Sequence, residues 1–287
     1  MRNMSTICIG MIVILFAGPA HATTWHVVPG GGGDATTLQT GIDLAQPGDE
    51  VLVAPGTYTG AGNVNLIFSG KDITVTTEAG AQQTVIDCEN ASRAFIFYND
   101  ASTVEGFTIR NGNAILGGAV YCESASPTVR YCVFVGNSAT SQGGALYLKQ
   151  GAPVFYNNTF HGCSATSGAT VWFEGPGFPQ FYQNIVCESA GGGAFGCAGS
   201  PYAFMACNDL YGNSGSTLLC AGNNGNNFSM DPLFCGIPGS GNFYLQQTSP
   251  CSAHFSPCGA SIGAFGTLCE VTATESITWG KVKSMYR

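Results

Sequence analysis

Charged residues are the scarcest class in this sequence. Lys, Arg, Asp and Glu make up 9% of its 287 residues, with 9 basic and 17 acidic side chains, whereas a globular protein carries roughly 25%. Nucleic-acid binding needs a stripe of Lys and Arg that neutralises phosphates, and the sequence has no such stripe. The composition therefore argues against a nucleic-acid partner. Since 45% of the residues are apolar, it also argues against a disordered chain.

Metal-binding patterns are lacking as well. The chain has four histidines and no two cysteines with CxxC spacing, so neither a metal site nor a cofactor is expected. No long apolar run follows the N-terminal one, which predicts no transmembrane segment in the mature chain. The sequence is rich instead in cysteine, with 13, and in glycine, with 41. This composition is typical of short strands and tight turns in an oxidising compartment.

Residues 1–22 have the layout of a secretory signal peptide. Arg2 precedes an apolar run over residues 7–17, and Ala20-His21-Ala22 provides small residues for a cleavage site. Cleavage after Ala22 removes one cysteine, Cys8, and leaves an even number, which suits disulfide bonding. We expect an exported protein that is secreted or displayed at the cell surface, with a bacterial outer-membrane or extracellular location favoured.

A repeat of about 25 residues runs through the middle of the chain. The second and fourth positions of the repeated segment are apolar in all five copies, whereas the fifth is polar in three. This period of two predicts a strand with one buried face. The copies begin shortly after a glycine, with spacings of 26, 25, 24 and 23 residues, at Ala119, Ala145, Thr170, Ala194 and Thr217.

The repeat predicts a parallel β-helix. A strand that recurs at this interval, without a helical pattern between its copies, is typical of coils stacked in parallel. A second strand in each coil is expected to begin at Val104, Val129 and Val154. Asn111 and Asn137 both lie eight residues before a repeat, and we expect them to stack along the coil axis.

A short helix and a distinct tail flank the repeats. Leu38, Ile42 and Ala45 have helical spacing and precede Pro47, so we expect a capping helix that covers the apolar end of the coil. The β-helix domain is predicted to span residues 23–270. Residues 271–287 are expected to form a linker and a basic, aromatic tail, which is either a sorting signal for the secretion machinery or a frayed terminus.

The segment after the expected helix, GDEVLVAPGTYTG (48–60), resembles the first strand of right-handed parallel β-helix proteins of the pectin-lyase-like superfamily. Residues 231–266 resemble the last coil of those proteins. The GGA segments with FVGN (134–137) are similar to the GGA and FxxN repeats of polymorphic outer-membrane proteins. Together these resemblances cover nearly all of residues 25–266 and imply a right-handed all-β solenoid. They imply little about activity, because one fold supports many functions.

Enzymes of that superfamily act on acidic polysaccharides with clustered carboxylates, and its hydrolases carry NTD, DD and GHG motifs. None of these motifs occurs here, so no catalytic residue is assigned from the resemblance. Asp87 and Glu89 are weak candidates, since alternation along a strand would place both carboxylates on one face, where they could act as an acid/base pair or bind calcium. The alternative is a solvated strand end before a turn.

Four cysteines fall into register when the coils are aligned. Cys197 and Cys220 share the fourth position of successive repeats, while Cys163 and Cys187 each lie seven residues before a repeat. Neighbouring parallel strands are roughly 4.8 Å apart, so a disulfide is possible within each pair. Buried free thiols are the alternative. The partners of the C-terminal cysteines stay open.

An aromatic column is the best candidate for a binding surface. Tyr121, Tyr147 and Trp172 occupy the outward third position of three successive repeats. Glu123, Lys149 and Glu174 lie two residues further along the same face. Rings stacked about 5 Å apart and edged by charges suit the faces and hydroxyls of a glycan. The alternative is that the rings stack on one another and stabilise the sheet.

These patterns favour a non-catalytic surface protein that binds glycans or partner surfaces along the solenoid. A polysaccharide lyase or glycoside hydrolase with a divergent site is a second hypothesis. A structural envelope protein is a third. Convergent carboxylates in a groove would favour the enzyme, whereas an aromatic surface without them would favour binding.

Overall fold

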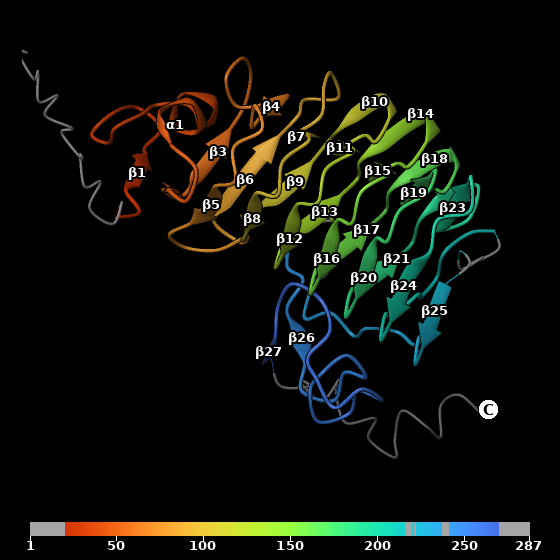
Figure 1. Cartoon of the computed structure of the whole chain (residues 1–287). Helices are drawn as coiled ribbons and strands as arrows, with labels where there is room; N and C mark the ends of the chain where they lie inside the picture. The colour runs from red at the N-terminus through yellow and green to blue at the C-terminus, as the bar shows by residue number, and fades with distance from the viewer. Residues whose placement is uncertain (1–20, 216–219, 221, 237–240, 270–287) are drawn as a thin grey trace, which may run out of the picture.

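The computed structural model describes residues 21–215, 220, 222–236 and 241–269, and its main body is a parallel β-solenoid (Figure 1). Successive coils contribute strands to sheets that run along the solenoid, and each strand pairs in parallel with its counterpart one coil away. The all-β parallel β-helix that the repeat predicts is confirmed.

Four sheets run along the solenoid. The first contains β1 (Thr24–Val27), β2 (Glu50–Val53), β5 (Thr74–Thr77), β8 (Thr103–Glu105), β12 (Thr128–Arg130), β16 (Val154–Tyr156), β20 (Gln180–Tyr182), β24 (Ala203–Ala206) and β25 (Gly222–Gly225). The second contains β3 (Gly56–Tyr58), β6 (Thr84–Asp87), β9 (Thr108–Arg110), β13 (Val133–Val135), β17 (Thr159–His161) and β21 (Ile185–Cys187). The third contains β10 (Asn113–Leu116), β14 (Ser138–Gln142), β18 (Ser164–Ser167) and β22 (Ala190–Gly191). The fourth contains β4 (Leu66–Ile67), β7 (Phe95–Tyr98), β11 (Val120–Glu123), β15 (Leu146–Lys149), β19 (Val171–Glu174) and β23 (Phe195–Ala198).

The expected second strand of each coil is in fact two strands. The segment that begins at Val129 divides into β12 and β13, because Tyr131 between them has a left-handed backbone with φ 52° and turns the chain. The third sheet was not predicted, since its Ser- and Ala-rich strands lack an apolar alternation. The repeated segment itself forms the fourth sheet, as expected, from β11 to β23. The copy at Thr217 lies largely outside the described residues.

The expected capping helix is confirmed as α1 (Leu38–Leu44). Thr37 caps its N-terminus by accepting a hydrogen bond from the Thr40 N–H. Leu38 and Ile42 are buried against the first coils. Gly41 permits this close approach, because a Cβ there would lie 2.5 Å from a methyl group of Val27. The helix therefore covers the apolar N-terminal end of the solenoid.

The core is built from side chains that stack in register from coil to coil. Phe134 and Phe160 pair across β13 and β17, and their parallel rings lie 4.6 Å apart. In the fourth sheet, Phe173 is in register with Cys197, and its ring packs diagonally against that of Phe195 with centroids 6.5 Å apart. Burial of each phenylalanine contributes about 1.5–3 kcal/mol. The apolar second and fourth positions of the repeat thus fill the interior, as predicted.

A buried asparagine ladder stabilises the turn between the first and second sheets. Asn158 donates its backbone N–H to Asn184 Oδ1 at 2.9 Å, and Asn184 in turn donates to Asn208 Oδ1 at 3.0 Å. The expected stack of Asn111 on Asn137 is wrong. The register of β9 and β13 brings Gly112 beside Asn137, and the Asn137 side chain accepts from the Gly112 N–H.

The disulfides confirm one predicted pair and contradict the other. Cys197 is bonded to Cys220. Cys163 and Cys187 are both free and buried, because β17 and β21 pair His161 with Cys187 and leave Cys163 out of register. Two further disulfides, which the sequence left unassigned, join Cys207 to Cys258 and Cys235 to Cys269.

Residues 231–236 and 241–269, which we call the strap, do not form the last coil that the resemblance implied. Their strands β26 (Leu245–Gln246) and β27 (Thr267–Cys269) pair with each other and not with the solenoid sheets. The strap folds back beside β12, β16 and β20 (Figure 1, blue). Its Leu245 and Ile262 form an apolar cluster with Ile185 of β21. The strap therefore covers part of the second sheet.

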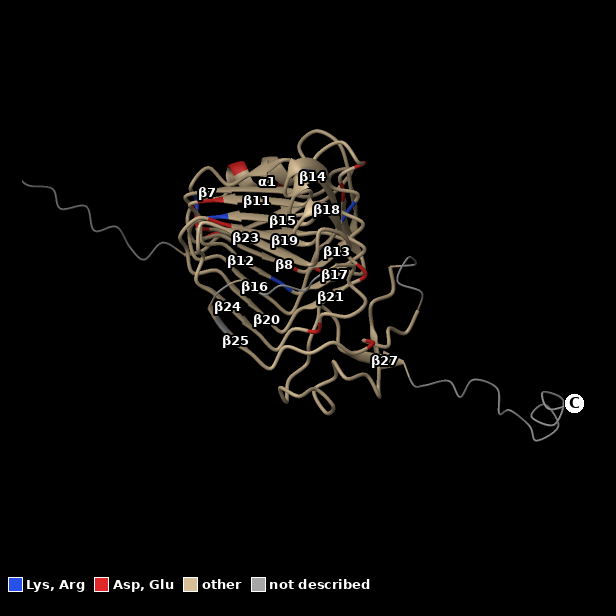
Figure 2. Cartoon of the chain, turned by 90° about the vertical axis from the view of Figure 1, so that its right-hand side faces the viewer, with Lys and Arg blue, Asp and Glu red and all other residues tan. Residues whose placement is uncertain are grey.

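Charged residues are sparse along the solenoid, as the colouring of the chain in Figure 2 shows. In the described part of the chain, no helix is long and apolar enough to cross a membrane. The predicted signal peptide lies almost wholly outside the described residues, and the predicted C-terminal tail lies entirely outside them.

Candidate functional site

The predicted aromatic column exists as a row on the fourth sheet. Tyr121, Tyr147 and Trp172 lie in register on β11, β15 and β19, and the first two rings stack 5.4 Å apart. The expectation that all three are exposed is wrong for Tyr147, of which 4% is accessible. The Trp172 indole lies against Gly196 of the next coil, where a Cβ would overlap the ring.

The polar groups of this row satisfy one another. The Tyr121 hydroxyl donates to Glu123 at 2.8 Å, and the Tyr147 hydroxyl donates to Glu174 at 2.7 Å. The Trp172 N–H also donates to Glu174, at 3.1 Å, while Lys149 forms an ion pair with Glu123 at 2.6 Å. Burial and the adjacent carboxylates raise the pKa of both tyrosines. The row is therefore a connected ladder, and its role in glycan binding stays a prediction.

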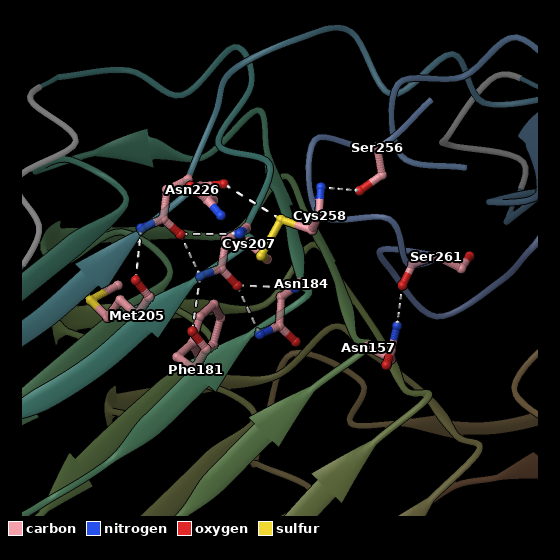
Figure 3. Close-up of a disulfide and its surroundings, with 11 residues drawn as sticks. Asn157, Phe181, Asn184, Met205, Cys207, Asn226, Ser256, Cys258 and Ser261 are labelled. Atoms are coloured by element: carbon pink, nitrogen blue, oxygen red, sulfur yellow. Dashed lines mark hydrogen bonds between the residues drawn. A yellow bond between two sulfur atoms is a disulfide. The ribbon is translucent and has the colours of Figure 1, made fainter. Parts of the chain in front are cut away.

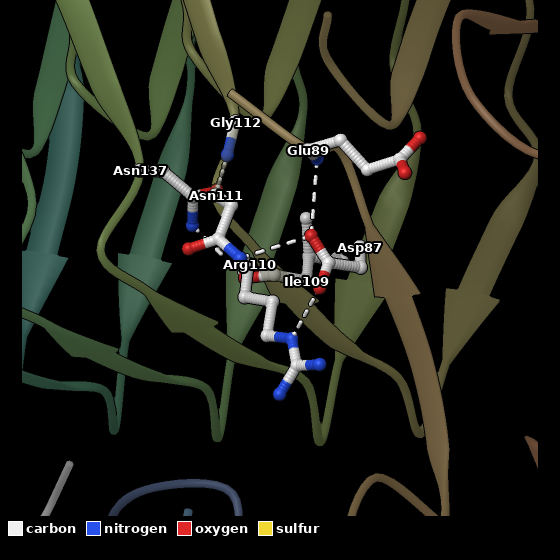
Figure 4. Close-up of polar contacts among 7 residues, drawn as sticks. All are labelled: Asp87, Glu89, Ile109, Arg110, Asn111, Gly112 and Asn137. Atoms are coloured by element: carbon white, nitrogen blue, oxygen red, sulfur yellow. Dashed lines mark hydrogen bonds and ion pairs between the residues drawn. The ribbon is translucent and has the colours of Figure 1, made fainter. Parts of the chain in front are cut away.

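Asp87 and Glu89 do not share a strand face. β6 ends at Asp87, and Glu89 follows in a left-handed turn with φ 54°. In Figure 4 the Glu89 carboxylate points away from Asp87, whose oxygens accept hydrogen bonds from Arg110, Asn111 and the Glu89 N–H. Despite the opposing effect of burial, these hydrogen bonds and the Arg110 charge hold the pKa of Asp87 below its usual range. Asp87 is thus an ion-pair partner at the end of its strand.

A different set of residues forms a groove beside the strap. Its floor is a row of left-handed corners between the first and second sheets, one on each coil. We call this the corner row. Its φ angles lie between 51° and 79° at Gly106, Tyr131, Asn157, Gln183 and Cys207. Glycine and asparagine tolerate this backbone, whereas an aromatic residue adopts it with strain.

The strap is attached to the corner row at several points. Cys258 is bonded to Cys207, and the Asn157 side chain donates to the Ser261 carbonyl at 2.8 Å (Figure 3). The Gly263 N–H donates to the Gln183 carbonyl at 2.9 Å. These contacts fix the strap along the coil axis and hold its next residues over Tyr131.

Two open cavities of about 310 Å³ each lie between the strap and the corner row. They share three lining residues, Tyr131, Ala264 and Phe265, so together they form one elongated groove, the strap groove. One end is lined by the turn between β5 and β6 and by Glu105, and the other by Asn157 and Gln183. The groove therefore extends over several coils.

Aromatic rings form its walls. Tyr131 is 40% exposed at the junction of the two cavities. Across from it, Tyr244 and Phe265 of the strap stack with ring centroids 4.7 Å apart. Aromatic faces with hydroxyl and amide groups at their edges suit ligands that combine C–H faces with hydroxyls.

One ion pair controls the charge of the strap groove. Glu105 Oε2 accepts from Arg130 Nε at 2.8 Å and lies 2.7 Å from Nη2. Arg130 Nη1 donates to the Tyr156 hydroxyl at 2.7 Å, and the guanidinium lies 5.8 Å from the centroid of the Tyr131 ring. The Tyr156 hydrogen bond and the Glu105 carboxylate raise the pKa of Arg130. Among the described residues that line the groove, Glu105 is the one charged side chain.

A buried aspartate holds the strap from beneath. Asp209 is inaccessible to solvent, and its carboxylate accepts from the Met230 N–H at 3.0 Å and the Cys251 thiol at 3.1 Å. Burial raises the pKa of Asp209 to about 6. A third cavity, of about 300 Å³, is lined by residues that include Glu188 and Asp231. His161 Nε2 lies 2.9 Å from Glu188 Oε2.

Comparisons with protein-family models, with curated proteins and with solved structures find no match for this chain. The candidate site is therefore assigned from the geometry of the chain alone. Sequence reasoning missed Glu105, Arg130 and Tyr131. A signal for the corner did exist, because Gly106 and Asn157 stand one repeat before and after Tyr131. No repeat or motif connects Tyr244 or Phe265 to that corner.

Proposed function

We propose that this chain is a non-catalytic carbohydrate-binding protein that holds an extended glycan in the strap groove. The observation that most supports this proposal is the position of Tyr131, an exposed aromatic residue with a left-handed backbone at the junction of the two cavities. A non-glycine residue in this conformation costs about 1–3 kcal/mol, and such strain clusters at functional sites. Glycine, as at the Gly106 corner, would form the turn without that cost, and asparagine, as at Asn157, would form it at a lower cost.

The chemistry of the groove favours a sugar chain. Tyr131, Tyr244 and Phe265 offer ring faces to the apolar face of a pyranose, while amide and hydroxyl groups surround them. The corner row advances roughly 4.8 Å per coil, so the groove follows an extended ligand over several coils. A chain of sugars therefore fits the groove better than a compact small molecule.

Binding is favoured over cleavage at this place. Glycoside hydrolysis requires two carboxyl groups across the scissile bond. Glu105 is the one carboxylate among the described groove-lining residues, and Arg130 already pairs with it. The alternatives of a divergent lyase or hydrolase, or of a structural envelope protein, receive less support from this geometry.

In this proposal, the aromatic row on the fourth sheet has a structural role and is not the glycan-binding surface. Tyr121, Tyr147 and Trp172 use their polar atoms on Glu123 and Glu174, so a glycan would have to displace bonds that already exist. A partner protein could still contact the exposed edges of this sheet. The strap groove, by contrast, has open volume beside Tyr131, of which 40% is exposed.

We further propose that the solenoid is right-handed, belongs to the pectin-lyase-like superfamily and is exported. The order of α1, β2 and β3 reproduces what the GDEVLVAPGTYTG segment implies. Three disulfides fit an oxidising compartment, which the signal-like residues 1–22 would reach. Residues 271–287 could then act as a sorting signal for the secretion machinery.

A glycan array followed by calorimetry tests the carbohydrate proposal. We expect the wild type to bind an oligosaccharide and Tyr131→Asn to lose at least tenfold in affinity without a fall in the thermal midpoint, because asparagine tolerates the left-handed corner. Tyr202→Asn is the matched control, because Tyr202 is 60% exposed but does not line the groove. Absence of binding to every glycan, or equal loss in both variants, would contradict the proposal. A lyase assay beside the array tests the enzyme alternative.

A further inference from the structure

The charge of the strap groove determines which glycans it can accept. Glu105 stands at the end of β8, and 29% of its side chain is exposed where it lines the groove. Arg130 engages Oε2 through both Nε and Nη2. Among the described residues, no group donates a hydrogen bond to Oε1. This oxygen is therefore an acceptor with no internal donor, on a side chain that lines the groove.

Arg130 is poorly placed to receive a second carboxylate. Three of its nitrogens already contact Glu105 and the Tyr156 hydroxyl, and its guanidinium lies beside the rings of Tyr131 and Tyr156, 5.8 and 5.9 Å from their centroids. The adjacent Glu105 neutralises its charge. No Lys or Arg lies among the described residues that line the groove.

A uronic acid would consequently enter the groove at a disadvantage. Its carboxylate would lose hydration without a free cation to replace it, and Glu105 would repel it. The whole chain, with a net charge of −8, adds to this repulsion. A sugar hydroxyl would instead bind favourably, because it can donate to Glu105 Oε1 in a charge-assisted hydrogen bond.

We infer that the strap groove is selective for neutral glycans over uronic-acid glycans, and that Glu105 is the residue that sets this selectivity. A hydroxyl of the neutral sugar donates to Oε1 while the sugar ring lies on Tyr131. The inference rests on the proposed carbohydrate binding and adds the class of ligand to it. It assigns Arg130 a positioning role, since Arg130 fixes the Glu105 carboxylate at the groove wall.

Calorimetry with two sets of oligosaccharides tests the selectivity. One set is neutral, from glucan, galactan and mannan, and the other consists of galacturonate and alginate oligomers of similar length. We expect wild-type protein to bind at least one neutral oligomer ten times or more as tightly as any uronate. Glu105→Gln should weaken neutral binding by about tenfold, because the charged acceptor is lost. The same change should strengthen uronate binding, because Arg130 is then unneutralised.

A matched variant separates selectivity from stability. Glu123→Gln removes the carboxylate of a comparable ion pair, that with Lys149, on the fourth sheet away from the groove. It should leave the ratio of neutral to uronate affinity unchanged. Wild-type protein that binds uronates as tightly as neutral oligomers overturns the selectivity but leaves carbohydrate binding intact. An unchanged ratio in Glu105→Gln overturns the role of Glu105. Binding of no glycan overturns both this inference and the proposed function.

Discussion

Cys207 and Cys258 join the strap to the corner row at one end of the strap groove. Cys207 is a left-handed corner with φ 57°, and the bonded Cys258 lies 51 residues later in the chain. The residues after Cys258 then pass over the corners of Gln183 and Asn157 and reach Tyr131. One covalent bond thus fixes the start of the segment whose far end forms a wall of the groove.

Removal of this bond should loosen the strap before it affects the solenoid. The double variant Cys207→Ser/Cys258→Ser is expected to lose about 2–4 kcal/mol of unfolding free energy, because a disulfide restricts the unfolded chain. Hydrogen exchange should accelerate in residues 259–266 while the amides of β13 and β17 stay protected.

The control for the disulfide is Cys235→Ser/Cys269→Ser, whose bond closes a loop inside the strap. In that variant, hydrogen exchange of residues 259–266 should stay as slow as in the wild type, because Ser261 keeps its contact with Asn157. Uniform exchange along the whole chain in the Cys207/Cys258 variant would contradict the independence of strap and solenoid.

The buried asparagine ladder should be among the most sensitive features of the fold. Asn184 accepts from the Asn158 N–H and donates to the Phe155 carbonyl at 3.0 Å, with no exposure to solvent. Asn184→Ala leaves both partners unsatisfied in the interior, at a cost of about 1–3 kcal/mol for each. Urea denaturation measures the loss. Asn113→Ala, on the exposed face of β10, should stay within about 0.5 kcal/mol of the wild type.

The coils could be predicted from the sequence because their signal is local. Val120, Leu146 and Val171 recur at nearly constant spacing, and period-two alternation fixes which side of each strand is buried. Register between strands was predicted less well. The length of a coil varies in its turns, so alignment from the fourth sheet misplaced Cys163 against Cys187 on the second.

The candidate site could not be predicted in the same way. The strap groove requires Tyr131 and Phe265 to line the same cavity, and neither repeat nor spacing relates two segments so distant in the chain. Alternation also shows that Tyr147 points away from the core, but not that Tyr121 and Glu174 cover it. Which residues cover a side chain from elsewhere in the chain depends on the whole fold, and no local sequence pattern reports it.

Tyr147 should behave as a structural residue. Its side chain is 4% exposed, stacks on Tyr121 and donates to Glu174. Tyr147→Ala is therefore expected to cost about 3–5 kcal/mol, as for other large buried aromatic residues. Tyr147→Phe should cost about 1 kcal/mol or more, because Glu174 loses a hydrogen bond. Thermal or urea unfolding gives both values. Loss of glycan binding by Tyr147→Phe without loss of stability would return the fourth-sheet row to the role of binding surface.

The stability of the strap should depend on pH through Asp209. The pKa of Asp209 is about 6 in the folded chain, above its ordinary value of 3.8, so the folded state binds the proton more tightly. The stabilisation from this group is therefore complete below about pH 4 and is lost as pH rises through 6. Relative to Asp209→Asn, which does not titrate, the wild type should lose about 2 kcal/mol between pH 4 and pH 7.

Asp100 provides the matched control for that pH dependence. It is also buried, accepts from the Tyr98 N–H, and has a pKa raised by burial to about 6, but its hydrogen-bond donor lies on β7 and not in the strap. Asp100→Asn should reduce the global pH dependence of unfolding by a similar amount. Hydrogen exchange in residues 245–263, however, should become independent of pH from 4 to 7, after correction for intrinsic exchange rates, in Asp209→Asn alone. If Asp100→Asn changes strap exchange as much, the pH effect arises from the solenoid as a whole and not from the contact of Asp209 with Met230 and Cys251.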